Sequence, residues 1–145
     1  MADNDDAVSE PDLGALVGRL VPRLIALEEP ILRTAGLSMW EYAIVSEVAA
    51  TAALSQRELS QRTGRDPTRL GRHLDELQER DIVSRERSGN HRQWSVSVTE
   101  HGRELHARVR SEIRSVEDEL LRGAMSDSQA ATFRQLLRQL VAAVS

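Results

Sequence analysis

The stretch from Leu54 to Gly102 constrains the fold more than any other part of this 145-residue chain. It opens with two short helical segments joined by the tight turn T-G-R-D-P, residues 63–67. Strand-like alternation follows in residues 82–87 and 93–98, with the turn S-G-N-H between them. A long amphipathic helix comes next. This order predicts a helix-turn-helix followed by a two-stranded ribbon, or wing.

Capping signals mark the helix starts, because a Ser or Asp side chain there accepts a hydrogen bond from a backbone N–H of the first turn. These signals are Ser38 with Glu41, Ser55 with Glu58, Ser126 with Gln129, Asp66 followed by Pro67, and Thr99 after the wing. The predicted fold is therefore mainly α with a small β-ribbon, in the order α-α-α-α-β-β-α-α. In the first helix, residues 12–34, we expect a kink at Pro22 and a break near Pro30.

Composition excludes several classes of protein. The chain has no cysteine, so a disulfide framework, a thiolate zinc site and a cysteine redox switch are excluded. Aromatic residues make up 3% of the chain, which favours a core of packed aliphatic helices. No stretch is apolar for long enough to predict a membrane span, and the N-terminus is acidic, unlike a secretory signal. We expect a cytoplasmic protein with no membrane partner.

The net charge of −4 is unfavourable for binding to nucleic acid, but the charge is unevenly distributed. All 19 basic residues are Arg. Between residues 57 and 72, five arginines face only two acids, Glu58 and Asp66; the arginines are Arg57, Arg62, Arg65, Arg69 and Arg72. This local basic footprint predicts focused binding to double-stranded DNA.

The second helix of the helix-turn-helix carries the predicted recognition residues. Leu70, Leu74 and Leu77 recur at helical spacing and fix its inward face. The recognition residues are expected on the opposite face, near the start of the helix. That end of the helix enters the major groove. Arg pairs with guanine edges there, and Thr meets a phosphate or a thymine methyl group. The predicted recognition residues are Arg65, Thr68, Arg69, Arg72 and His73.

Two further groups are predicted to contact DNA. In the helix before the turn, the backbone contacts are assigned to Ser55, Gln56 and Arg57. In the wing, contacts with the minor groove or phosphates are assigned to Arg87, Asn90, His91 and Arg92. Trp94 follows on the next strand, and we expect it to pack against the helix behind the wing.

These residues resemble the MarR family of bacterial transcriptional regulators. The resemblance rests on G-L-S-M-W-E-Y-A-I-V (36–45), the helix-turn-helix (54–77) and V-T-E-H-G-R-E-L (98–105), and it spans nearly the whole chain. It implies a homodimer that represses genes by binding a pseudo-palindromic operator. It also implies that a small aromatic effector releases this homodimer from DNA. The effector pocket would lie near Trp40, and no cofactor or metal is implied. The family wing often carries D-x-R, where this chain has Asn90-His91-Arg92.

The flanking helices are predicted to form the dimer. Their apolar stripes exceed what one winged domain can cover, and a two-fold pair fits DNA half-sites about one turn apart. We therefore divide the chain into an acidic disordered tail (1–10), a helical dimerisation region (11–35 and 100–145) and a winged DNA-binding region (36–99).

Other functions remain open at this point. A winged helix can bind a protein instead of DNA, and a regulator of this kind can be insensitive to ligands. A metal-responsive regulator would use His101, Glu104 and His106, but the two histidines are five residues apart and do not share a helix face. An enzyme is not favoured, because the four histidines are scattered and there is no Gly-rich phosphate loop.

Overall fold

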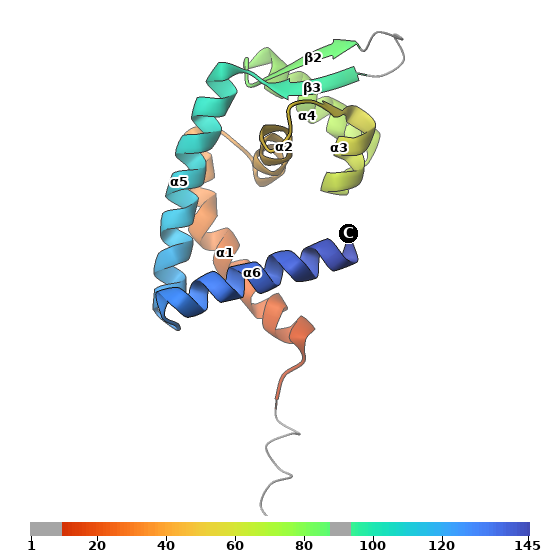
Figure 1. Ribbon diagram of the computed structural model, residues 1–145. Coiled ribbons are helices and arrows are strands. Elements are labelled where there is room, and N and C mark those ends of the chain that lie inside the picture. The colour runs from red at the N-terminus through yellow and green to blue at the C-terminus, as the bar shows by residue number, and fades with distance from the viewer. Residues whose placement is uncertain (1–9, 88–93) are drawn as a thin grey trace, which may run out of the picture. The chain divides into compact units, whose positions relative to one another are not determined.

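The structure is a computed structural model that describes residues 10–87 and 94–145 (Figure 1). Residues 1–9 of the predicted tail and the wing residues Asn90, His91 and Arg92 lie outside this part. The elements, in chain order, are α1 (Leu13–Ala35), α2 (Met39–Ala49), β1 (Leu54–Ser55), α3 (Gln56–Thr63), α4 (Pro67–Glu79), β2 (Val83–Arg87), β3 (Trp94–Val98), α5 (Glu100–Arg122) and α6 (Asp127–Val144). They fall into two compact units, residues 31–115 and residues 1–30 with 116–145.

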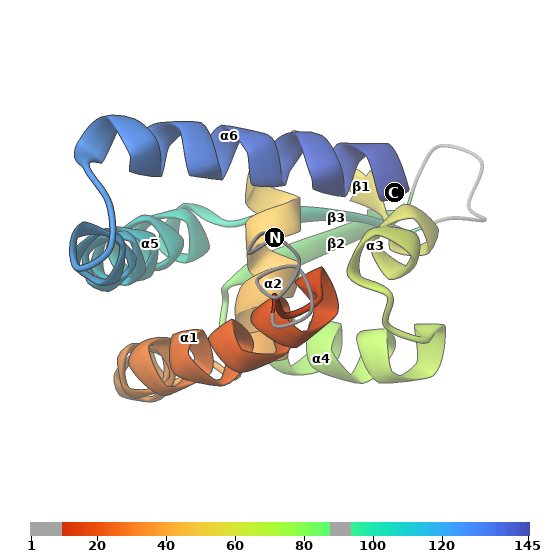
Figure 2. The ribbon, with the colours of Figure 1, turned by 90° about the horizontal axis from the view of Figure 1, so that it is seen from below.

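The unit of residues 31–115 holds the helix-turn-helix and the sheet. The sheet is antiparallel, with strand order β1-β3-β2, and α2 packs against β3 (Figures 1 and 2). The predicted mainly helical fold with a small ribbon is confirmed, with one addition. Leu54 pairs with Val96 in β1, a strand of two residues that is too short to show alternation in the sequence.

The hydrophobic core lies entirely within this unit. Leu70, Leu74 and Leu77 point inward from α4, as predicted, and contribute to it. The other buried apolar side chains come from α1, α2, β1, α3, the sheet, α5 and the segments that join them: Leu32, Leu37, Ile44, Val45, Val48, Leu54, Leu59, Ile82, Val83, Val96, Leu105, Val109 and Ile113. This shared core fixes α3 and α4 against the sheet.

The predicted helix starts are confirmed. Ser38 and Ser126 form complete capping boxes, and Asp66 caps α4 by accepting from the backbone N–H of Arg69. The Ser55 hydroxyl accepts from the backbone N–H of Glu58 but donates to that residue's carboxylate, so its box is half formed. Ser55 is also the last residue of β1.

Gly102 allows α5 to start directly against the sheet. Thr99 caps α5 by accepting from the Gly102 N–H at 2.9 Å, while its own backbone N–H donates to the Ile82 carbonyl at 3.1 Å. A Cβ at position 102 would lie 2.0 Å from that carbonyl oxygen. Only glycine allows the start of α5 to lie this close to the Ile82 carbonyl. This close contact sets the direction in which α5 leaves the wing.

Helix α1 differs from the sequence prediction. The predicted break near Pro30 is wrong, because the helix continues to Ala35 with both Pro22 and Pro30 inside it. A proline within a helix removes one hydrogen bond, and the Leu, Ala, Glu and Arg residues around Pro30 favour the helix enough to carry it through.

The other unit comprises the first part of α1, the end of α5 and α6. No residue in 10–30 or 116–145 is buried. Arg134 of α6 ties its helix to α5, through Glu117 at 3.2 Å and Asp118 at 2.8 Å. Across the described parts of the chain, no helix combines the length and apolar character that crossing a membrane requires.

Candidate nucleic-acid interface

The exposed face of α4 carries three of the predicted recognition residues. Thr68, Arg69 and Arg72 are all exposed, on the face opposite the buried leucines. The N-cap of this helix is set by Asp66, whose pKa is held below its ordinary value, first by the hydrogen bond from the Arg69 backbone N–H and then by nearby arginine charges. The side chain of Arg69 also lies 3.4 Å from the Asp66 carboxylate.

The five arginines of the basic footprint have different surroundings. Arg62 lies 3.7 Å from Glu47 and therefore links α3 to α2. Arg57 and Arg72 are exposed, and neither side chain forms a hydrogen bond or ion pair with any residue in 10–87 or 94–145. These two guanidinium groups are available to an anionic partner.

Arg65, in the turn, lies beside His73 of α4, and both side chains are less exposed than Thr68, Arg69 and Arg72. The Arg65 guanidinium stacks over the Trp40 ring, 4.1 Å from its centroid, and lies 3.3 Å from His73 Nε2. The Arg65 Nε is buried without a hydrogen-bond partner among the described residues. The Arg65 side chain therefore braces the turn against α2, and this contact also covers one face of Trp40.

Arg85 of β2 joins the wing to the helix-turn-helix, a role that the sequence prediction missed. Its guanidinium donates to Gln78 Oε1 at 2.8 Å and to Gln56 Oε1 at 3.5 Å, and it forms an ion pair with Asp75. The side chain is 17% exposed. Because the three partners belong to α3 and α4, one side chain fixes β2, α3 and α4 relative to one another.

The described part of the wing places Arg87 beside Trp94. The two residues are cross-strand partners, and the Arg87 guanidinium lies 4.9 Å from the Trp94 ring centroid. Arg85 lies 5.9 Å from the same ring. Trp94 is 41% exposed, so the prediction that it packs against the helix behind the wing is wrong. Its ring instead supports arginines of the neighbouring strand, which is a cation–π contact.

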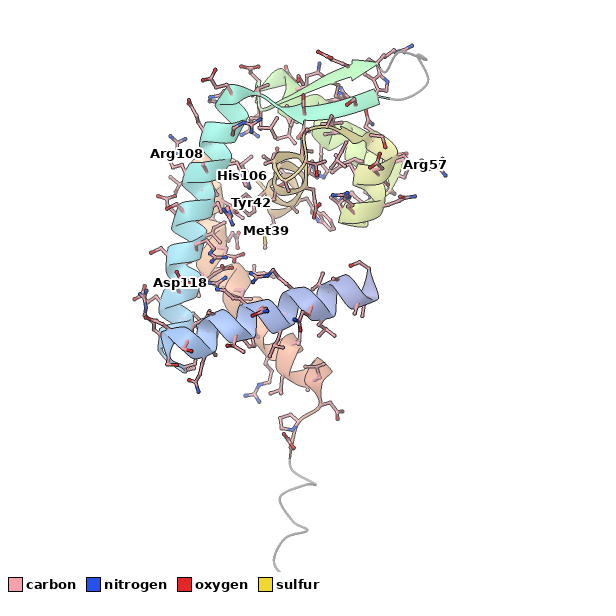
Figure 3. All side chains as sticks on the ribbon, viewed as in Figure 1. Met39, Tyr42, Arg57, His106, Arg108 and Asp118 are labelled. Atoms are coloured by element: carbon pink, nitrogen blue, oxygen red, sulfur yellow. The ribbon has the colours of Figure 1, made fainter. Side chains whose placement is uncertain are left out.

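The predicted backbone residues at the start of α3 are partly committed to internal contacts. The Ser55 hydroxyl caps α3, and the Gln56 amide oxygen accepts from Arg85. The Gln56 amide group keeps its two N–H donors for another partner. Arg57 points into solvent from α3 (Figure 3).

A groove lies between α2 and α5, and none of its lining residues belongs to α3 or α4. Its volume is about 680 Å³, and it is lined by Tyr42, Ser46, Ala49, Ala50, Arg103, His106, Ala107, Arg110, Ser111 and Arg114. Tyr42 and His106 face one another across it (Figure 3), with stacked rings 5.5 Å apart, and His106 Nε2 lies 3.0 Å from the Ser46 hydroxyl. Trp40, the predicted pocket residue, is not part of this lining.

Comparison with known proteins supports the assignment of a winged helix-turn-helix fold. Residues 35–93 match the model of the MarR family. Solved structures with a similar fold include NadR in complex with 4-hydroxyphenylacetate, at 18% identity over 91% of this chain and 94% of that chain, with a TM-score of 0.76. Wild-type MarR from E. coli is 20% identical over 91% of this chain and 98% of that one, with a TM-score of 0.79.

A third similar structure is the MarR family protein Rv2887 of Mycobacterium tuberculosis in complex with p-aminosalicylic acid. It is 24% identical over 90% of this chain and 98% of that chain, with a TM-score of 0.73. No curated protein sequence matches the chain significantly. The chain is therefore a MarR-like winged helix-turn-helix protein: its residues 35–93 match the family, and its fold is that of MarR-family transcriptional regulators.

Proposed function

We propose that this protein is a homodimeric repressor in which each protomer inserts α4 into the major groove of a pseudo-palindromic operator. The observation that carries this proposal is the exposed face of Thr68, Arg69 and Arg72, mounted on a helix whose other face is fixed in the core. Arg72 has no partner among the described residues, so pairing with a guanine edge would break no internal ion pair.

The remaining contacts follow from the same placement. Arg57 and the Gln56 amide group would bind phosphates beside the groove, because both present N–H donors at the start of α3. Ser55 would reach the same backbone, although its hydroxyl already caps α3. The wing would contribute through Arg87, Asn90, His91 and Arg92, with Arg87 supported by Trp94.

Dimerisation would occur through the unit of residues 1–30 and 116–145. Its large apolar side chains are exposed in the single chain, with exposed fractions between 37% and 77%; they are Leu13, Leu16, Val17, Leu20, Val21, Leu27, Leu136, Leu137, Leu140, Val141 and Val144. So much apolar surface on two helices indicates an interface. A second copy of the chain is the proposed partner, because two winged domains then meet two half-sites.

Release from DNA would be triggered by a small aromatic effector. NadR and Rv2887, which have similar folds, are seen with 4-hydroxyphenylacetate and p-aminosalicylic acid. In this chain the α2–α5 groove offers the space, and Trp40, which Arg65 contacts on one face, is not part of its lining. A bound effector would contact α2 of the winged domain and α5 at once.

Selection of genomic fragments with the purified protein tests the proposal. The selected operator should contain two inverted half-sites. Arg72→Ala should weaken binding to it by about 1–3 kcal/mol and relax one base preference, whereas Arg108→Ala, which removes an exposed arginine of α5, should not. Affinity of the Arg72→Ala protein equal to that of wild type, or a monomer in sedimentation, would reject the proposal.

A further inference from the structure

Three arginines form a row along the α2–α5 groove. Arg103, Arg110 and Arg114 are seven and four residues apart on α5, so they share one helix face. Their Cα atoms are separated by about 10 Å and about 6 Å along the helix axis. None of the three forms an ion pair with a residue in the described parts of the chain, and none of the residues that line the groove is acidic.

The other wall of the groove supplies an aromatic surface. Tyr42 of α2 stacks with His106, and Ser46 holds the His106 ring through its hydroxyl. The pKa of His106 lies below its ordinary value, first because the ring is partly buried and then because Arg110 is positively charged. The groove therefore combines stacked rings with three guanidinium groups that form no ion pair with a described side chain.

We propose that the α2–α5 groove binds an aromatic compound that carries two or more negative charges, such as an aryl phosphate or an aromatic dicarboxylate. Guanidinium groups recognise both anions through paired N–H donors. A singly charged acid would engage one end of the row and leave the other arginines without a partner. The volume of about 680 Å³ lies within the usual range for small-molecule sites. This inference rests on the proposed function in taking the ligand as an effector.

Calorimetric titration of the full chain at pH 8 tests the inference with three probes that share a benzene ring. Benzoate carries one charge, whereas isophthalate and phenyl phosphate carry two. The doubly charged probes should bind about tenfold or more tightly than benzoate, as expected for one additional charge-assisted contact. Whichever of the two binds better identifies the anion as phosphate or carboxylate, and either result supports the inference.

Two variants with the same change of net charge provide the control. Arg110→Gln should remove most of the preference for doubly charged probes. Arg108→Gln should keep it, because Arg108 projects from α5 away from the side that carries His106 (Figure 3) and does not line the groove. An equal loss in both variants would mean that the binding is non-specific charge attraction, and would overturn the inference.

Two further outcomes would also overturn it: benzoate binding as tightly as the doubly charged probes, or no binding of any probe at millimolar concentration. Fluorescence anisotropy with the selected operator separates this test from the test of DNA binding. Intact operator binding without anion binding would refute only the groove. Tight binding of the doubly charged probes by a protein that selects no operator would refute the proposed function and leave the anion site standing.

Discussion

Replacing Glu28 of α1 should change how the stability of the protein depends on pH. Glu28 lies against Glu117 of α5, and its pKa is raised from 4.5 to about 7, first by partial burial, then by its hydrogen bond to Glu117 and by that residue's charge. Arg134 pairs with Glu117 and Asp118 and forms no ion pair with Glu28 in the described parts of the chain. A protonated Glu28 can donate to Glu117, whereas an ionised one is repelled by it.

The sign and size of the effect follow from linkage. The unfolded chain releases this proton near its ordinary pKa and the folded chain near 7, so the stabilisation is complete below pH 4.5 and is lost as the pH rises towards and through 7. The full shift corresponds to about 3.4 kcal/mol, which solvent screening of this partly exposed group reduces to about 1–2 kcal/mol. Glu28→Gln keeps a neutral hydrogen-bond donor and should recover that amount at pH 8.

Urea unfolding monitored by circular dichroism, at pH 4.5 and pH 8 and at one fixed protein concentration, measures the effect. Glu28→Gln should unfold at higher urea than wild type at pH 8, and at nearly the same urea at pH 4.5. Glu119→Gln, an exposed glutamate on the same helix as Glu117, is the control and should follow the wild-type profile. Parallel pH profiles for wild type and Glu28→Gln would refute the reasoning.

Three other predictions concern the winged unit. Gly102→Ala should lower the free energy of unfolding by about 3 kcal/mol because its Cβ meets a backbone carbonyl; Gly71→Ala, whose Cβ meets nothing within 4 Å, should not, and equal melting temperatures would contradict this. Arg85→Met should weaken operator binding about tenfold with unchanged helix content, and wild-type affinity would show that the link between wing and helix is dispensable. Arg110→Gln should raise the pKa of His106 in an NMR titration, and an unchanged pKa would exclude Arg110 as a cause of its shift.

Much of the fold is predictable because its determinants are local. The Ser38 and Ser126 boxes, the Asp66 cap and the leucine spacing of α4 act within a few residues, and the structure confirms them. Strand β1 depends on pairing with β3, about 40 positions later, which no local pattern reveals. The passage of α1 through Pro30 was mispredicted, because a proline lowers helix propensity without forbidding the helix when its neighbours favour it.

Part of the candidate site was likewise predictable from the sequence, and part was not. The exposed positions of Thr68, Arg69 and Arg72 follow from the amphipathic pattern of α4. The contacts of Arg65 with Trp40, and of Arg85 with α3 and α4, join segments far apart in the sequence and required the structure. The alternation of residues in β2 does place Arg85 and Arg87 on one face of the strand, and it was the only sequence signal for the role of Arg85.

Hydroxyl-radical footprinting of the selected operator tests the central claim most directly, because it shows where each protomer lies on DNA. Two copies of α4 related by a two-fold axis predict two protected segments, symmetric about the operator centre and about one helical turn apart. Both should weaken together in Arg72→Ala and persist in Arg108→Ala. A single protected segment, or a symmetric footprint that Arg72→Ala leaves unchanged, would contradict the assignment of α4 as the element that reads DNA.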